Sequence, residues 1–345
     1  NPIYLADNGI TIKACDDANV GDTGVLDGVT YTVVDEATLR TMVANEEDVT
    51  KVVTTKVTDM NLMFFLGNDS NDEPIYNDFN QDISSWDVSN VTDISGMFAA
   101  TAFNQPIGNW DVSSVTDMRS MFAYADTFNQ PIGDWDVSSV TDMRVMFGFT
   151  SFNQPIGNWD VSNVTSMVNM FRYAEAFDQP IGDWDVSSVT NMSLMFYENN
   201  VFNQPIGDWD VSNVTNMFGM FGEANAFNQD IVSWDVSNVT NMRVMFAFAT
   251  SFNQPIGNWD VSNVTTMNGM FGETNAFNQD IVSWDVSNVT DMQAMFQNAS
   301  AFNQPIGDWD VSNVTDMIYM FRGATSFNQD LSSWGVDGVT ECSSF

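Results

Sequence analysis

The stretch FNQPIGNWDVSSVTDMRSMF, residues 103–122, decides the fold because the chain repeats it, with small changes, through most of its length. Tryptophan marks the copies, from Trp86 to Trp334, at intervals of 24 or 25 residues. A fixed period in this range is typical of a solenoid, in which each copy forms one coil that cannot bury its apolar face alone. The sequence therefore predicts a stack of coils.

Within each copy, apolar residues recur at the same offsets, and we expect them to face the interior of the stack. In one copy these residues are Phe202, Ile206, Trp209, Val211, Val214, Met217, Met220 and Phe221. The alternation of Trp209, Asp210 and Val211 predicts a short strand, and the spacing from Asn213 to Phe221 predicts about two turns of helix. The Trp and Phe columns are thus predicted to form the core rather than a platform for carbohydrate.

Two regions are predicted from this pattern. Residues 1–47 match no copy, and strands around 9–14 and 28–34 followed by a helix from Asp35 are expected to form an N-terminal α+β cap. The solenoid is expected to span 48–345 as about twelve coils, because Val49, Val52, Val57 and Met60 repeat the later spacing without tryptophan. An insertion at 65–78 is expected to leave the stack as a loop.

The repeat resembles two known families through its order Phe-Asn-Gln-Pro-Ile-Xaa-Xaa-Trp-Asp-Val-Ser-Xaa-Val-Thr-Xaa-Met. The apolar offsets look like those of BspA-like leucine-rich repeats, and the full motif is similar to the tandem repeat of mycoplasma lipoproteins and other bacterial surface proteins. The resemblance covers residues 48–345. It implies a right-handed leucine-rich-repeat-like solenoid with a parallel β-sheet on one face and short helices on the other. It also implies a secreted or cell-surface bacterial protein used in adhesion.

The charge of the chain restricts its partners. Nine Lys and Arg residues face 46 Asp and Glu, there is no His, and the formal net charge is -37. Nucleic acids and anionic membranes are therefore excluded as expected partners, and no stretch is apolar enough for membrane insertion. Cys15 and Cys342 lie near opposite ends of the chain and predict neither a disulfide framework nor a metal site, and Cys342 is expected to face the interior of the last coil.

The aspartate that follows each tryptophan is the main candidate for ligand binding. If Trp and Val face inward, these carboxylates form an outward row in which neighbours repel one another. Three explanations remain open: hydrogen bonds from nearby Ser, Thr or backbone groups, cations such as calcium collected by the row, or screening in a high-salt habitat. The row consists of Asp87, Asp111, Asp136, Asp160, Asp185, Asp210, Asp235, Asp260, Asp285 and Asp310.

The inserted loop contains a second candidate site. Asp69, Asn71, Asp72 and Glu73 offer oxygen ligands for calcium, although their spacing does not fit the helix-loop-helix calcium consensus, and a solvated loop is the alternative.

We expect a non-catalytic protein, because the equivalent copies provide no position that combines a nucleophile, a base and an oxyanion donor. The protein is also expected to be monomeric. No cofactor is expected to be required, with calcium as the candidate ion. The expected function is adhesion or ligand binding through the acidic face, with a surface protein or glycan of a host or neighbouring cell as partner. A structural spacer and the targeting region of a secreted enzyme are the alternatives.

Overall fold

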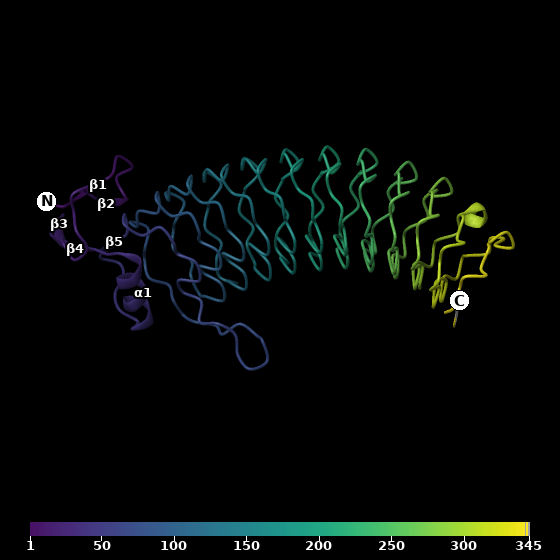
Figure 1. Ribbon diagram of the computed structural model, residues 1–345, viewed down its shortest axis with the longest axis horizontal. Coiled ribbons are helices and arrows are strands. Elements are labelled where there is room, and N and C mark those ends of the chain that lie inside the picture. Colours follow the sequence, from purple (N-terminus) through teal and green to yellow (C-terminus); the bar gives the residue numbers. More distant parts are fainter. Residues whose placement is uncertain (342, 344–345) are drawn as a thin grey trace. The chain divides into compact units, whose positions relative to one another are not determined.

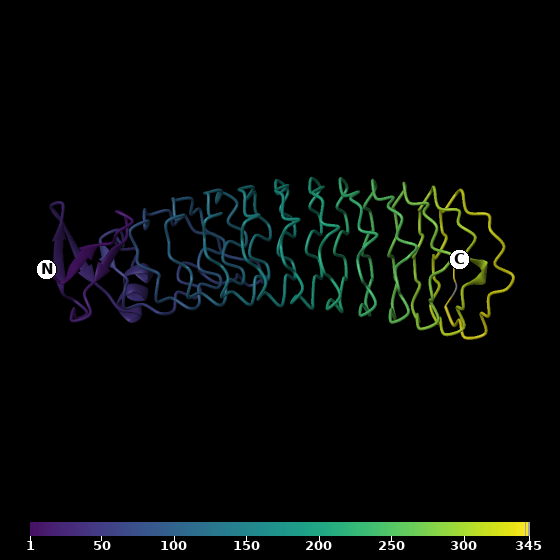
Figure 2. The same cartoon turned by 90° about the horizontal axis from the view of Figure 1, so that it is seen from above.

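The computed structural model describes residues 1–341 and 343 of the 345-residue chain. These residues form two compact units, Asn1–Asn163 and Val164–Phe345. After residue 48 the chain runs as successive coils within each unit (Figure 1 and Figure 2). Cys15 is a free, partly buried thiol. The prediction that Cys342 faces the interior lies outside the described residues.

Among the described residues, regular strands lie only at the start of the first unit (Figure 1). We call residues 1–53 the capping region, which includes the beginning of the first coil. Strands β1 (Ile3–Leu5) and β2 (Ile12–Ala14) pair antiparallel. Strands β3 (Thr23–Leu26) and β4 (Val29–Val33) form a hairpin, and β4 also pairs in parallel with β5 (Val52–Val53). Since β5 belongs to the first predicted coil, this sheet joins the capping region to the repeats.

Helix α1 (Glu36–Ala44) follows β4 and begins where an acidic residue can cap it. The carboxylate of Asp35 accepts a hydrogen bond from the N–H of Thr38 at 2.8 Å, which satisfies one of the free donors of the first turn. The side chain of Leu39, in the middle of this helix, is fully buried. A small core of the strands lies beside it, made of Ile3, Ile12, Ala14, Ala18, Val33 and Val53.

The coils are built from turns, so the prediction of a strand and a helix in each copy is wrong. Backbone hydrogen bonds close turns from Trp209 to Ile206 (3.2 Å) and from Met220 to Met217 (3.2 Å). In the described part of the chain the helices are α1 and the short 3-10 segment η1 (Ile306–Asp308). A spacing of three between buried side chains fits a hydrogen-bonded turn as well as a helix, and here each turn begins and ends on a buried residue.

Neighbouring coils are joined by parallel backbone hydrogen bonds at the segment where helices were predicted. In the second unit, the N–H of Met217 donates to the carbonyl of Asn241 at 3.0 Å, and the N–H of Phe221 donates to that of Met245 at 2.9 Å. Isolated parallel bridges, such as Asn216 with Asn241, mark this line in coil after coil. The Trp209–Val211 segment, where the parallel sheet was expected, forms no strand.

These turns require left-handed backbone conformations at two positions per coil. Gly219 (φ 58°) and Glu223 (φ 59°) occupy them in one coil, and Val244 (φ 47°) and Phe248 (φ 59°) in the next. Positive φ at the third position is the geometry of a type II turn. It directs alternate N–H groups toward the adjacent coil, at a steric cost that is greatest for a β-branched residue such as Val244.

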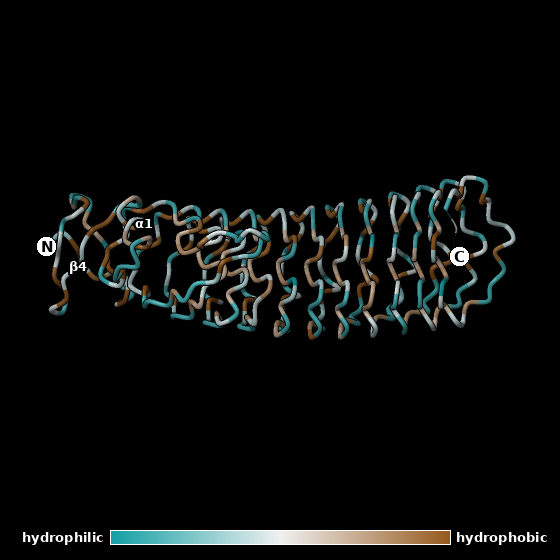
Figure 3. The backbone as a smooth tube through the Cα atoms, turned by 90° about the horizontal axis from the view of Figure 1, so that it is seen from below, coloured by the Kyte–Doolittle hydropathy of each residue, from teal (hydrophilic) through white to brown (hydrophobic). Residues whose placement is uncertain are grey.

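The predicted apolar residues are buried in the interior of the coils, which confirms this prediction. Hydrophobic and hydrophilic stretches follow one another along the backbone of the coils (Figure 3). The indole N–H of Trp209 donates to the carbonyl of Ile181 in the preceding coil at 3.0 Å, so the polar edge of the buried ring is satisfied. The rings of Trp209 and Trp234 lie 6.4 Å apart at an angle of 3°. Each coil therefore buries its face against the next one.

The insertion at 65–78 forms a hairpin that extends from the coils of the first unit (Figure 1). Asn68 and Pro74 form an antiparallel bridge, and the N–H of Ile75 donates to the carbonyl of Gly67 at 2.8 Å. Leu66 and Tyr76, at the two sides of its base, are among the most exposed large apolar side chains of the molecule.

Candidate functional site

The aspartates after tryptophan form an exposed set that we call the aspartate column. In each member, one carboxylate oxygen accepts a hydrogen bond from the backbone N–H of the serine two residues later, as in Asp210 with Ser212 at 3.0 Å. The serine hydroxyl adds a second bond in several coils, for example Ser162 to Asp160 at 2.6 Å. The column comprises Asp111, Asp136 and Asp160 in the first unit and Asp185, Asp210, Asp235, Asp260, Asp285 and Asp310 in the second.

These local hydrogen bonds lower the pKa of individual members of the column. The hydroxyl and the N–H of Ser138 lower the pKa of Asp136 below its ordinary value, and the neighbouring Asp160 carboxylate opposes this shift. In the second unit, Ser212 likewise lowers the pKa of Asp210 against the opposing charge of Asp235. At Asp136 and Asp210 the serine donors therefore outweigh the repulsion from the adjacent carboxylate and favour the charged form.

Asp87 was predicted to belong to this outward row, and for this residue the prediction is wrong. Its side chain is only 2% exposed because the capping region covers it. Lys13 of β2 lies 3.4 Å from its carboxylate, and the hydroxyl of Thr55 donates to it at 2.6 Å. Asp87 thus joins the capping region to the coils and is inaccessible to a ligand.

Among the residues that the structure describes, no positive charge is paired with the aspartate column. In residues 1–341 and 343, the ion pairs of Lys and Arg involve other carboxylates. The second unit contains no lysine and three arginines, Arg172, Arg243 and Arg322. Within each unit, the column is therefore an exposed line of carboxylates available to cations outside the chain.

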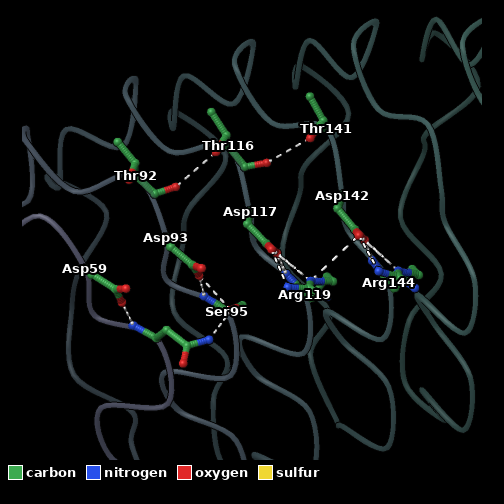
Figure 4. A network of polar contacts seen from close by, with 11 residues as sticks. Asp59, Thr92, Asp93, Ser95, Thr116, Asp117, Arg119, Thr141, Asp142 and Arg144 are labelled. Atoms are coloured by element: carbon green, nitrogen blue, oxygen red, sulfur yellow. Dashed lines mark hydrogen bonds and ion pairs between the residues drawn. The ribbon is translucent and has the colours of Figure 1, made fainter.

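Sequence reasoning missed a second polar column, which lies on the line of backbone bridges. Asp93, Asp117 and Asp142 occupy it in the first unit, where Figure 4 shows Arg119 and Arg144 beside the last two. The guanidinium groups approach their carboxylates to 2.7 Å. The occurrence of Arg two residues after Asp was the signal that could have revealed these pairs.

A threonine column runs beside this line (Figure 4). The hydroxyl of Thr116 donates to the carbonyl of Thr92 at 3.3 Å, and that of Thr141 donates to the carbonyl of Thr116 at 3.3 Å. These hydroxyls therefore bond neighbouring coils to one another.

The predicted calcium ligands of the insertion do not converge on one point. Asp69 accepts hydrogen bonds from the N–H groups of Asn71 (2.7 Å) and Glu73 (3.1 Å), and Asp72 accepts one from the amide of Asn68. Throughout the described residues, no group of three or more His, Cys, Asp or Glu side chains is arranged to hold a metal ion. The carboxylates of the hairpin thus stabilise its own turn.

The described residues also contain no helix with the length and apolar character needed to cross a bilayer.

Three comparisons relate this chain to known proteins. Among solved structures, the crystal structure of a TLR13–ssRNA13 complex is similar at 9% identity and a TM-score of 0.20, over 86% of this chain. The chain spans 57% of that protein chain, and a superposition at this TM-score supports no argument about fold or ligand. A comparison with curated proteins finds no match.

The family described as "Mycoplasma protein of unknown function, DUF285" matches four times, over residues 34–151, 70–183, 147–259 and 248–345. These matches follow the tandem repeats and confirm the predicted relation to mycoplasma repeat proteins. Because they cover most of the sequence, the chain belongs to the DUF285 family.

Proposed function

We propose that this chain is a non-catalytic, secreted or surface-displayed bacterial protein that binds a ligand along its aspartate column and so promotes adhesion. The resemblance of its repeats to BspA-like and mycoplasma surface proteins supports the location. The tandem repeats support the binding role, because the stacked coils of each unit present equivalent side chains on one surface.

The observation that carries this proposal is the exposed, unpaired state of the aspartate column. Each carboxylate is held in one orientation by its serine, so little side-chain freedom is lost on binding. A line of fixed negative charges attracts a partner with clustered Lys or Arg residues and increases its association rate. The proposed partner is therefore a basic surface on a protein of a host or neighbouring cell.

Calcium offers a second route for the same column. Divalent ions held by the outward carboxylates would bridge them to an acidic glycan, which the column alone would repel. This route predicts that mucin glycans bind in calcium and are released by a chelator, whereas a basic protein binds without calcium.

The experiment measures the binding of the whole chain to immobilised fibronectin, mucin and a lysine-rich peptide at physiological ionic strength. The test variant replaces Asp by Asn at the six column positions of the second unit: Asp185, Asp210, Asp235, Asp260, Asp285 and Asp310. Asn preserves the turn, since Asn191 accepts the same hydrogen bond from Ser193 at 3.0 Å. Affinity is expected to fall about tenfold or more, which corresponds to at least ~1.4 kcal/mol.

The matched control removes six charges from other columns of the same unit by Glu to Gln or Asp to Asn changes. These positions are Glu198, Glu223, Glu273, Asp280, Asp291 and Asp316. If the control loses as much affinity as the test variant, net charge rather than the column causes binding. If the unchanged protein binds none of the probes, the proposal fails and a structural spacer becomes the better explanation.

Binding should also depend on pH in the direction set by the carboxylates. The lowered pKa values of Asp136 and Asp210 keep these groups charged down to at least the ordinary aspartate range near pH 3.8. We therefore expect binding to persist from neutral pH to about pH 4.5 and to disappear as pH falls through the lowered values. A loss already complete near pH 6 would point to a different group, on the partner.

A further inference from the structure

The phenylalanines at the start of each copy form a column inside the first unit. Phe79, the first member of this column, differs from the members that follow it. Phe103 lies 6.0 Å from Phe79 and 6.2 Å from Phe128, measured between ring centroids. It also stacks on Phe98 at 4.0 Å. Phe103 and Phe128 are fully buried, whereas Phe79 remains partly exposed.

The cause is a missing ring in the first coil. Phe79 stacks on Phe64 at 3.7 Å and has Phe103 on one side, but in the part of the chain that the structure describes no aromatic ring lies on its other side. The first coil is offset by 34 residues from the second, as Val49 from Ile83, so the equivalent position is Asn45. This residue ends helix α1 and carries an amide in place of a ring.

A cavity of about 430 Å³ opens at this place. Its apolar lining includes Val43 of α1, Val49, Phe64, Leu66 and Phe79. The volume is within the range of small-molecule sites, which are usually concave and mostly apolar with a few placed polar groups. The end of the phenylalanine column is thus a preformed space with aromatic walls.

Three carboxylates, those of Glu46, Glu47 and Asp78, also line this cavity. Glu47 accepts a hydrogen bond from the amide of Asn45 at 3.1 Å. Within residues 1–341 and 343, the ion pairs formed by Lys and Arg use none of the three. The cavity therefore combines aromatic rings with uncompensated negative charge.

We propose that this cavity binds a small arylalkylammonium compound, that is, an aromatic ring joined by a short chain to a protonated amine. The ring would take the place of the absent neighbour of Phe79 and gain the stacking that each later phenylalanine has. The ammonium group would lie among the carboxylates of Glu46, Glu47 and Asp78, whose negative charge attracts it. This site is separate from the aspartate column.

Three probes of similar shape test the two parts of the proposal. 2-Phenylethylammonium carries the ring and the positive charge, phenylacetate carries the ring and a negative charge, and butylammonium carries the positive charge without the ring. Calorimetric titration of the whole chain should show saturable binding of the first probe only. Equal binding of phenylacetate, or of butylammonium, would overturn the proposal.

Two variants locate the binding. Combined Glu46→Gln, Glu47→Gln and Asp78→Asn changes should weaken 2-phenylethylammonium binding at least about tenfold. A control with Asp16→Asn, Asp17→Asn and Glu73→Gln removes three exposed charges outside the cavity and should bind normally. Equal loss in both variants would show that binding follows net charge and would contradict the site.

Filling the cavity provides a measurement that does not depend on charge. Val43→Phe places a ring into the space from α1, so binding should be lost while the thermal midpoint stays the same or rises through added apolar burial. Retained binding in this folded variant would place the ligand elsewhere.

Discussion

The capping region and the coils reach stability in different ways. In the capping region, strands pair with one another and α1 carries its own helical hydrogen bonds around the local core of Ile3, Ile12 and Val33. In the coils, each turn is closed by one backbone hydrogen bond, and most of the other backbone hydrogen bonds connect a coil to the adjacent coil. This difference indicates that a destabilising substitution in the capping region affects only that region, whereas one in a coil also destabilises the neighbouring coils.

The largest expected effect comes from removing a tryptophan in the second unit. Trp209→Ala leaves a large void and removes the donor to the Ile181 carbonyl, so we expect a loss of about 4 kcal/mol in unfolding free energy. Hydrogen exchange should increase in the coils of Trp184 and Trp234 as well.

The comparison variant for the capping region is Leu39→Ala, which deletes a fully buried side chain beneath α1. It should cost about 3 kcal/mol and accelerate exchange only within residues 1–53. If Trp209→Ala accelerated exchange in its own coil alone, the proposed difference between the two regions would be wrong.

A smaller effect is expected where the two regions meet. Asp87→Asn removes a buried charge and leaves Lys13 without its partner, which should cost about 3 kcal/mol or slightly less, because Lys13 is 27% exposed. Asp210→Asn occupies the same repeat position but is exposed, and its change should stay within about 0.5 kcal/mol. Urea unfolding of both variants measures the contrast, and equal values would show that Asp87 does not join the regions.

The smallest expected effect concerns left-handed residues. The capping region places Asp27 (φ 49°) and Gly28 at such positions, residue types that suit this conformation, whereas the coils place Val244 there. Val244→Gly should therefore raise stability by about 0.5 to 1 kcal/mol, and Asp27→Gly should change it little.

Arg243→Gly is the control for this prediction, because Arg243 precedes Val244 in the chain but is not among the residues with positive φ. Glycine there should lower stability through its greater freedom in the unfolded chain. If Val244→Gly and Arg243→Gly both raised the free energy of unfolding, glycine would act through something other than relief of the left-handed strain at residue 244.

The sequence by itself determined the period, the identity of the buried residues and the exposure of most of the aspartate column. These features follow from spacing alone, since residues at equal offsets in equivalent copies receive equal environments. Burial of Trp209 and exposure of Asp210 are therefore readable from one copy.

Only the tertiary structure decided the backbone path and the exceptions to the period. A spacing of three from Met217 to Met220 suits both a helix and a turn, and the choice depends on bonds to Asn241 and Arg243 in the next coil. The burial of Asp87 depends on Lys13 and the capping strands, which lie far away in sequence. The space beside Phe79 depends on where α1 ends. A repeat pattern describes the environment that equivalent copies share. It does not describe the first coils, whose neighbours are the capping region rather than another copy.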